Sequence, residues 1–266
     1  MSLDLRTLRA VVLDMDGVLW RGDAVLPGIA DFFAFCQREG IAYAFATNNS
    51  TKTVDMYVDR LKRLGISADP EQIITSAVAT SEYIARHYPV ETPVYVIGGP
   101  GIRDGLSARG FQEDPERAEL VVVGMDMAVT YDKLKVAALR IRAGATFIGT
   151  NGDRTFPIPE GLAPGNGSIL AAIEAATDTA PLIIGKPETA MFEVALRRMD
   201  VGAGQMLMVG DRLETDILGA QRAGLRTALV LTGITTPEQA RTDPIQADAV
   251  FESLVALHAE WAAAVS

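Results

Sequence analysis

Short apolar runs that favour strands alternate with longer amphipathic stretches that favour helices along this sequence of 266 residues. Such alternation is typical of βαβ units, and it predicts an α/β fold with parallel sheets. Several runs are almost wholly apolar, as expected for strands that helices cover on both faces. The strand candidates are residues 9–14, 42–47, 93–99, 120–125, 145–150, 181–185, 205–211 and 226–233.

Two stretches of the sequence follow the same plan. "REGIAYAFATNN" (38–49) and "RAGATFIGTNGD" (142–153) each contain a helix end, a glycine, a strand and then Thr-Asn. This similarity suggests two sheets built on a related pattern. One sheet would contain the early and late strands, and the other would be inserted between them.

The composition excludes several classes of function. The formal net charge is −10 and the isoelectric point is near 4.8, so the chain lacks the basic surface that nucleic acid requires. An anionic small substrate needs only local positive charge. No apolar run reaches the length of about 18 residues that a membrane span needs. The start "MSLDLRTLRA" lacks the apolar stretch of a signal peptide. We therefore expect a soluble, cytoplasmic protein.

Cysteine and histidine chemistry is not expected. Cys36 is the single cysteine, so it forms no internal disulfide, and we interpret it as a small buried hydrophobic residue. His87 and His258 lie in segments of helical pattern, and neither has a cysteine or histidine neighbour. Zinc binding and histidine acid–base catalysis are therefore disfavoured.

Polar residues follow four of the predicted strands. In open parallel α/β sheets, ligands bind beyond the carboxyl ends of the strands, so these residues are the candidates for a site. In chain order they are Asp14, Asp16 and Gly17; Thr47, Asn48 and Asn49; Gly185, Lys186 and Pro187; and Gly210, Asp211, Glu214 and Asp216.

Several carboxylates at one sheet edge need a compensating charge. Two like charges about 4 Å apart repel by about 4 kcal/mol at an effective dielectric constant of about 20. Protonation of one carboxyl group would relieve this repulsion, and so would a divalent cation. Oxygen ligands without histidine or cysteine suit Mg²⁺, which also binds phosphate oxygens. Lys186 fits the same site as a point charge for a phosphate.

The pair of aspartates after the first strand suggests two different catalytic roles. At a strand end that curls into a glycine turn, Asp14 and Asp16 can approach one ligand from different angles. One carboxylate can attack phosphorus and form an aspartyl-phosphate. The other can protonate the leaving oxygen and later take a proton from water.

Four stretches resemble the motifs of the haloacid dehalogenase (HAD) superfamily of phosphatases. They are "DMDGVL" (14–19), "TNN" (47–49), the lysine of "GKP" (185–187) and "GDRLETD" (210–216). "TNNST", "GNGSILAAIEAAT" and "GKPE" are similar to the capped class IIA subfamily, which includes NagD-type and 4-nitrophenylphosphatase-like enzymes. The resemblance implies a Rossmann-like, doubly wound core of residues 1–79 and 181–266, with an inserted α/β cap of residues 80–180.

The resemblance also implies a role for each motif residue. Asp14 would be the nucleophile and a magnesium ligand, and Asp16 the general acid–base with its backbone carbonyl on the metal. Asp211 would bind the Mg²⁺ ion, which Asp216 would support indirectly. The residues implied at the phosphoryl group are Thr47, Asn48, Asn49 and Lys186. Because dehalogenases lack an aspartate equivalent to Asp16, phosphoryl transfer is favoured over carbon–halogen cleavage.

Two other stretches imitate these motifs. "TNGD" (150–153) resembles the second motif and "VVVGMD" (121–126) the fourth. We prefer Thr47 because it follows Asp14 at the distance of about one βαβ unit. "GMD" lacks a second aspartate five residues on, so Asp126 is interpreted as a loop residue.

The cap would cover the site and recognise the leaving group. We expect "TNGDRTFPIP" (150–159) to be the substrate loop, with Asp153 and Phe156 as its contacts. The predicted reaction is magnesium-dependent hydrolysis of a small phosphate monoester of the nucleotide, phosphoglycolate, pyridoxal phosphate or 4-nitrophenyl phosphate type. The sequence does not choose among these, and related caps suggest a homodimer.

Two alternatives stay open. A phosphotransferase or phosphomutase on the same fold would hand the phosphoryl group to a sugar, but such chains carry a helical cap between the first two motifs. The 32 residues between Asp14 and Thr47 leave no room for one. A non-catalytic phospho-ligand binding protein is disfavoured because Asp14, Asp16, Lys186 and Asp211 are all present.

Overall fold

The computed structural model describes residues 3–158 and 160–266, and these form two compact units. Unit 1 contains residues 1–47, 55–74 and 187–266, so it combines the early and late parts of the chain. Unit 2 contains residues 48–54 and 75–186. The functional division at 79/80 and 180/181 stays a prediction.

Unit 1 is built on a six-stranded sheet of order β14-β13-β12-β1-β4-β5. The pairings of β14 with β13, β13 with β12, β12 with β1 and β1 with β4 are all parallel. Because the chain moves outward from β1 in one direction and from β12 in the other, the topological switch point lies between these two strands. The strands are β1 (Ala10–Leu13), β4 (Ala42–Thr47), β5 (Ile73–Thr75), β12 (Met206–Gly210), β13 (Arg226–Val230) and β14 (Ala249–Phe251).

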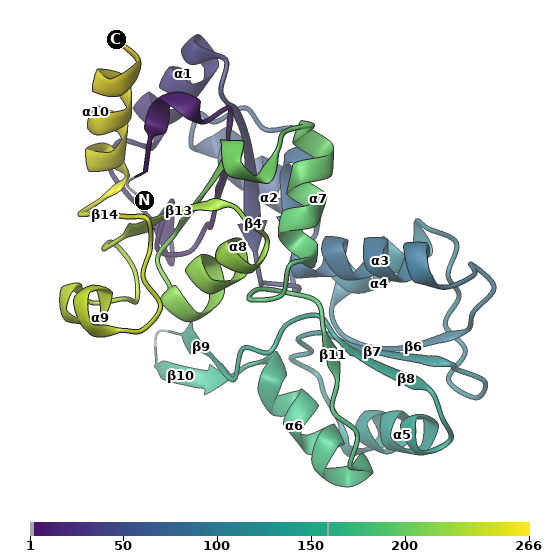
Figure 1. Cartoon of the computed structure of the whole chain (residues 1–266). Coiled ribbons are helices and arrows are strands. Elements are labelled where there is room, and N and C mark those ends of the chain that lie inside the picture. Colours follow the sequence, from purple (N-terminus) through teal and green to yellow (C-terminus); the bar gives the residue numbers. More distant parts are fainter. Residues whose placement is uncertain (1–2, 159) are drawn as a thin grey trace. The chain divides into compact units, whose positions relative to one another are not determined.

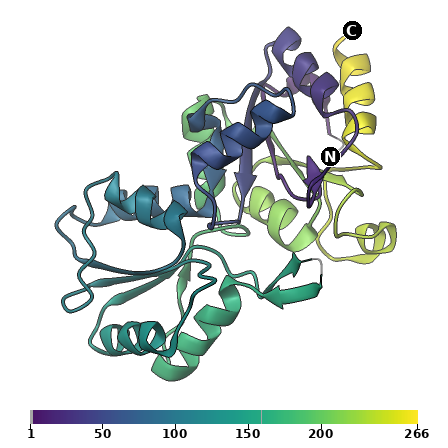
Figure 2. The same cartoon turned by 180° about the vertical axis from the view of Figure 1, so that it is seen from behind.

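Helices connect and flank the strands of unit 1. They are α1 (Ile29–Glu39), α2 (Val54–Arg63), α7 (Ala190–Met199), α8 (Leu218–Arg222), α9 (Pro237–Thr242) and α10 (Leu254–Val265). Both views show α1 beside α10 (Figures 1 and 2), where the rings of Phe32 and Phe35 contact Trp261. Helix α1 ends at Gly40, whose left-handed backbone lets its N–H bond the carbonyls of Cys36 and Gln37.

Short elements complete unit 1. A small antiparallel hairpin joins β2 (Trp20–Arg21) to β3 (Ala24–Val25) directly after the first strand. Single turns occur at η1 (Leu5–Thr7), η2 (Pro70–Gln72), η3 (Ala203–Gln205) and η4 (Leu213–Ile217), and η4 is π-helical.

Unit 2 is built on a four-stranded parallel sheet of order β11-β8-β7-β6. Its strands are β6 (Val94–Ile97), β7 (Leu120–Val123), β8 (Thr146–Gly149) and β11 (Leu182–Ile183). Helices α3 (Ser76–His87) and α4 (Pro100–Ser107) lie on one face, and α5 (Tyr131–Arg142) and α6 (Asn166–Thr177) on the other (Figure 1). An antiparallel pair, β9 (Thr155–Ile158) with β10 (Gly161–Pro164), precedes α6.

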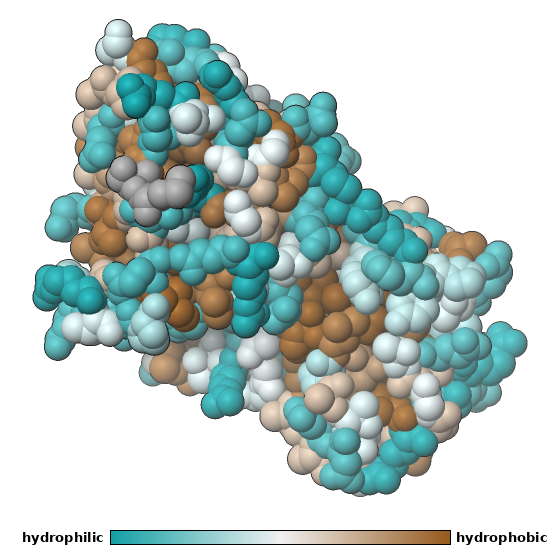
Figure 3. Space-filling model, in the orientation of Figure 1, coloured by the Kyte–Doolittle hydropathy of each residue, from teal (hydrophilic) through white to brown (hydrophobic). Residues whose placement is uncertain are grey.

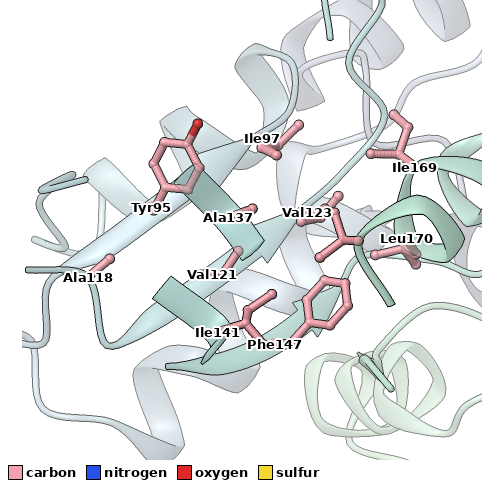
Figure 4. Close-up of a cluster of buried hydrophobic side chains, with 11 residues drawn as sticks. Tyr95, Ile97, Ala118, Val121, Val123, Ala137, Ile141, Phe147, Ile169 and Leu170 are labelled. Atoms are coloured by element: carbon pink, nitrogen blue, oxygen red, sulfur yellow. The ribbon is translucent and has the colours of Figure 1, made fainter. Parts of the chain in front are cut away.

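One core of unit 2 fills the space between its sheet and helices α5 and α6 (Figure 4). Alternate residues of the strands point into it, because neighbouring side chains of a strand face opposite sides. Val121 and Val123 of β7 therefore meet Phe147 of β8, Ile141 of α5 and Leu170 of α6 in one cluster. All four residues of β7 are buried, which explains why this run carries no polar side chain.

The structure confirms the predicted α/β class with parallel sheets. Each of the eight expected strand runs contains a strand. Strands β2, β3, β5, β9, β10 and β14 were not expected, and each spans only two to four residues. Cys36 is fully buried in α1, and burial raises the pKa of its thiol to about 12. The thiol is therefore protonated at neutral pH.

The face in Figure 3 carries mainly hydrophilic residues with hydrophobic ones among them. Large apolar side chains that are exposed include Met127, Tyr131 and Leu162.

Among the described residues, every helix is too short or too polar to traverse a lipid bilayer. The cytoplasmic location stays a prediction.

The core of unit 2 gives a first test. Phe147→Ala removes a buried ring from the cluster of Figure 4 and should lower the free energy of unfolding by about 3–5 kcal/mol. Leu139→Ala is the matched control, because Leu139 of α5 is 60% exposed and its truncation should cost less than about 0.5 kcal/mol. Urea denaturation followed by circular dichroism measures both. Equal losses would contradict the burial of Phe147.

Candidate active site

The first predicted site residue lies at the switch point of the unit 1 sheet. Asp14 follows β1 directly, and its backbone N–H continues the ladder to Val209 of β12 at 2.9 Å. Asp211 follows β12, which is the neighbouring strand. Parallel pairing of β1 with β12 therefore brings both aspartates to the carboxyl edge of the sheet, where ligands of such folds bind.

Three carboxylates gather at this edge. Asp14, Asp211 and Asp216 each offer an oxygen, and these atoms all lie within 4.8 Å of one another. The three residues are only 8%, 2% and 1% exposed, respectively. Asp216 reaches the group because it lies in the π-helical turn η4, five residues after Asp211.

The backbone holds two of these carboxylates. One oxygen of Asp216, Oδ2, accepts hydrogen bonds from the N–H groups of Asp211 at 3.2 Å and Arg212 at 3.1 Å. Oδ2 of Asp211 accepts from the N–H of Ile234 at 2.7 Å, just after β13. These hydrogen bonds from the backbone fix the positions of the two carboxylate groups.

Glycines make room for the carboxylates. A Cβ atom added to Gly233 would lie 1.8 Å from Oδ2 of Asp211, and one added to Gly17 would lie 2.5 Å from the same atom. A Cβ atom at Gly210 would lie 2.2 Å from Cβ of Asp216. Gly17 also has a φ angle of +88°, which other residues rarely adopt. Any side chain at these positions would displace the acidic group.

The donor set fits a hard divalent cation. Three buried carboxylates at this separation repel one another strongly, and an oxygen-binding cation is the ordinary means of keeping all three ionised. Tyr57 of α2 lies within the electrostatic influence of Asp16 and Asp14. Burial is the main cause that raises the pKa of its hydroxyl, and the charges of Asp16 and Asp14 add to the effect. Tyr57 is therefore a neutral hydroxyl beside an acidic group.

Asp16 lies in the turn after Asp14 and is exposed. Its Oδ1 accepts a hydrogen bond of 3.0 Å from Nε1 of Trp20. Thr47, the last residue of β4, is buried in the same unit, and its side chain contacts the hydroxyl of Tyr57.

A second group of predicted residues lies within unit 2. The side-chain amide of Asn48 binds the backbone of Lys186 twice: Oδ1 accepts from the Lys186 N–H at 2.8 Å, and Nδ2 donates to the Lys186 carbonyl at 3.0 Å. Nδ2 also contacts the carboxylate of Asp153 at 3.2 Å. Lys186 is 2% exposed, so this amide fixes the backbone of a buried lysine.

The remaining candidates of unit 2 have local partners. Oδ1 of Asn49 accepts from the N–H and hydroxyl of Thr51 at 2.9 and 2.7 Å. Phe156 lies on β9 opposite Ala163 and is half-buried, so part of the expected substrate loop is a strand. Pro159, the last residue of that loop, lies outside the described residues. Asp126 lies in a loop and pairs with Lys133 at 2.7 Å.

The structure thus brings together Asp14, Asp211 and Asp216 in unit 1, and Asn48, Asp153 and Lys186 in unit 2. Sequence reasoning missed Gly233, Tyr57 and Trp20. The strand-end rule could have found Gly233, since "LTG" ends the predicted strand at 226–233. For the buried side chains of Tyr57 and Trp20 the sequence carried no signal beyond an apolar pattern.

Known proteins match these motifs and this fold. The model of the haloacid dehalogenase-like hydrolases matches residues 11–112, and a HAD-hydrolase-like model matches residues 183–257. An acid sugar phosphatase of Staphylococcus saprophyticus is 37% identical over 251 residues, which cover 94% of this chain and 96% of that protein.

Solved structures agree. A 4-nitrophenylphosphatase from Thermotoga maritima superposes with a TM-score of 0.92 at 35% identity, covering 97% of this chain and 98% of that one. A glycerol phosphate phosphatase from Mycobacterium tuberculosis, solved in complex with calcium, gives 0.87 at 32% identity over 96% of this chain and 76% of that one. The chain therefore belongs to the haloacid dehalogenase-like hydrolases, within the capped class IIA group of phosphatases.

Proposed function

We propose that this phosphatase hydrolyses a small phosphate monoester with the help of Mg²⁺, through an aspartyl-phosphate on Asp14. The observation that carries the proposal is the cluster of three buried carboxylates at the switch point of the sheet. Such a cluster suits a divalent cation, and a cation at this place suits a phosphoryl group.

The metal would be held by carboxylate oxygens of Asp14 and Asp211 and by the backbone carbonyl of Asp16. Asp216 would support this arrangement indirectly, because its Oδ2 already accepts two backbone hydrogen bonds beside Asp211. When bound, Mg²⁺ neutralises the carboxylates and the phosphoryl oxygens, which lowers the barrier to nucleophilic attack. The related calcium complex supports a divalent cation of this kind without selecting magnesium.

Asp14 and Asp16 make the covalent bond and transfer the protons in the proposed reaction. A carboxylate oxygen of Asp14 attacks phosphorus and the ester P–O bond breaks, while Asp16 gives a proton to the departing oxygen. An alcohol leaves, and Asp14 carries the phosphoryl group. Asp16 then takes a proton from water as the water oxygen attacks phosphorus. Phosphate departs, the Asp14 carboxylate is restored, and Asp16 is protonated again.

Polar groups of the other motifs would hold the phosphoryl oxygens. Thr47 supplies a hydroxyl, Asn48 and Asn49 supply N–H groups, and Lys186 supplies an ammonium charge that offsets the phosphoryl group. The two hydrogen bonds from Asn48 to the Lys186 backbone support this assignment, since they fix the backbone from which the lysine side chain extends.

The leaving group defines the substrate. Asp153 and Phe156 are the proposed contacts, with the aromatic ring suited to stacking on a base, a ring or a nitrophenyl group. The relatives are named as an acid sugar phosphatase, a 4-nitrophenylphosphatase and a glycerol phosphate phosphatase, which supports a substrate class of alkyl and aryl monoesters. A homodimer formed through the cap stays a prediction, which light scattering would test.

Substitution of the nucleophile tests the mechanism. Asp14→Asn should lower kcat for 4-nitrophenyl phosphate by about 10³-fold or more, because no other carboxylate takes over the attack. Asp31→Asn is the matched control, since it removes an exposed aspartate from α1 and should leave kcat within about twofold. Release of 4-nitrophenol measures both variants. Retained turnover in Asp14→Asn would refute the covalent intermediate.

Removal of the metal tests the carboxylate cluster. EDTA should abolish turnover, and Mg²⁺ should restore it. At a Mg²⁺ concentration of about 100 times its Kd, the folded state should gain about 2.7 kcal/mol and the unfolding temperature should rise. Asp211→Asn should remove most of that rise, which calorimetry measures without any substrate. Asp31→Asn, the control, should keep the full rise, and a rise that persists undiminished in Asp211→Asn would contradict the assignment of the ligands.

A further inference from the structure

A buried tryptophan holds the proposed general acid. Asp16 is exposed at the turn after β1, and an exposed carboxylate ordinarily samples several rotamers. Here its Oδ1 accepts a hydrogen bond of 3.0 Å from Nε1 of Trp20, whose side chain is fully buried. The buried donor thus restrains an otherwise free side chain.

The backbone between the two residues is closed by its own hydrogen bonds. The N–H of Gly17 donates to the carbonyl of Trp20 at 2.7 Å, and the N–H of Leu19 donates to that of Met15 at 2.8 Å. Gly17 also accepts from the hydroxyl of Thr232 at 2.6 Å. The turn therefore fixes the backbone of Trp20 relative to that of Asp16.

The ring of Trp20 is itself held in place. The guanidinium of Arg60, from α2, lies 3.9 Å from the ring centroid, which is the geometry of a cation–π contact. The same guanidinium donates to the carbonyl of Gly22 in the β2–β3 hairpin. Arg60 is thus anchored to the hairpin that carries Trp20, and it limits rotation of the indole.

The chemistry of the donor selects one oxygen of Asp16. An indole N–H donates and cannot accept, so the oxygen that faces it must act as an acceptor. The proton that passes to the leaving group must then be carried by Oδ2. We propose that Trp20 is a positioning residue that orients Asp16 so that Oδ2 delivers and recovers the proton. This inference rests on the proposed acid–base role of Asp16.

The role predicts a dependence on the leaving group. A poorly acidic leaving group needs a proton in the transition state more than an acidic one does. Phenyl phosphate and 4-nitrophenyl phosphate have nearly the same shape, but phenol is the weaker acid. Loss of the indole donor should therefore reduce turnover of phenyl phosphate much more than turnover of 4-nitrophenyl phosphate.

The test compares two conservative substitutions in one chain. Trp20→Phe removes the N–H and keeps a ring under Arg60. Trp261→Phe is the matched control, because Trp261 is equally buried in α10 and, within the part of the chain that the structure describes, its Nε1 has no hydrogen-bond partner. For Trp20→Phe we expect kcat/KM to fall about tenfold or more with phenyl phosphate. This loss is part of the roughly 10²–10⁴-fold that acid–base catalysis contributes. With 4-nitrophenyl phosphate, kcat/KM should fall less than about threefold. For Trp261→Phe, both values should stay within about twofold.

A double-mutant cycle identifies the partner. In the background of Asp16→Asn, Trp20→Phe should cause no further loss with phenyl phosphate, because the acid that it orients is gone. A further tenfold loss there would overturn the inference. Equal losses with both substrates in Trp20→Phe alone would also overturn it, since they indicate general damage to the site.

One measurement does not need the Trp20→Phe protein to fold. The chain has two tryptophans, so the spectrum of ¹⁵N-labelled protein contains two indole N–H signals, and Trp261→Phe leaves only that of Trp20. Asp16→Asn should shift this signal, and Asp31→Asn should not. An unmoved signal overturns the contact. Retained turnover in Asp14→Asn would instead refute the proposed function, so the two failures are distinguishable.

Discussion

The structure of unit 1 must keep three buried carboxylates close together. Asp14, Asp211 and Asp216 have oxygens within 4.8 Å of one another and are almost fully buried. Like charges at that separation oppose folding unless something offsets them. Backbone N–H groups offset part of the charge at Asp211 and Asp216. A cation is the natural source of the rest, which links the stability of this region to its chemistry.

The sheet order explains why these residues meet although nearly 200 positions separate Asp14 from Asp211 along the chain. Strands β1 and β12 are neighbours, so the first residues after them occupy one edge. Glycines complete the arrangement. The backbone at Gly17 and Gly233 approaches Asp211 so closely that even a methyl group would collide with the carboxylate.

The sequence was sufficient for much of this picture. The apolar runs located eight of the strands, among them every strand of five residues or more, and the acidic residues after two of them identified Asp14, Asp211 and Asp216, because strand ends and charge are both visible in the sequence. Short strands such as β5 and β14 were missed, since three residues hold too little of an alternating pattern. The contact of Trp20 with Asp16 was also missed, because in the sequence a tryptophan contributes only to the apolar pattern and gives no sign of the carboxylate to which it donates. The double hydrogen bond from Asn48 to Lys186 joins positions 138 apart, and only tertiary structure reveals it.

The buried Cys36 has a consequence for how the chain can be studied. Only a thiolate reacts readily with alkylating reagents, and this thiol is both protonated and inaccessible while α1 stays in place. Alkylation of Cys36 in the native protein would therefore require α1 to detach transiently from its neighbours. Because Cys36 is the single cysteine of the chain, the rate at which the protein is labelled reports how often this part of unit 1 opens.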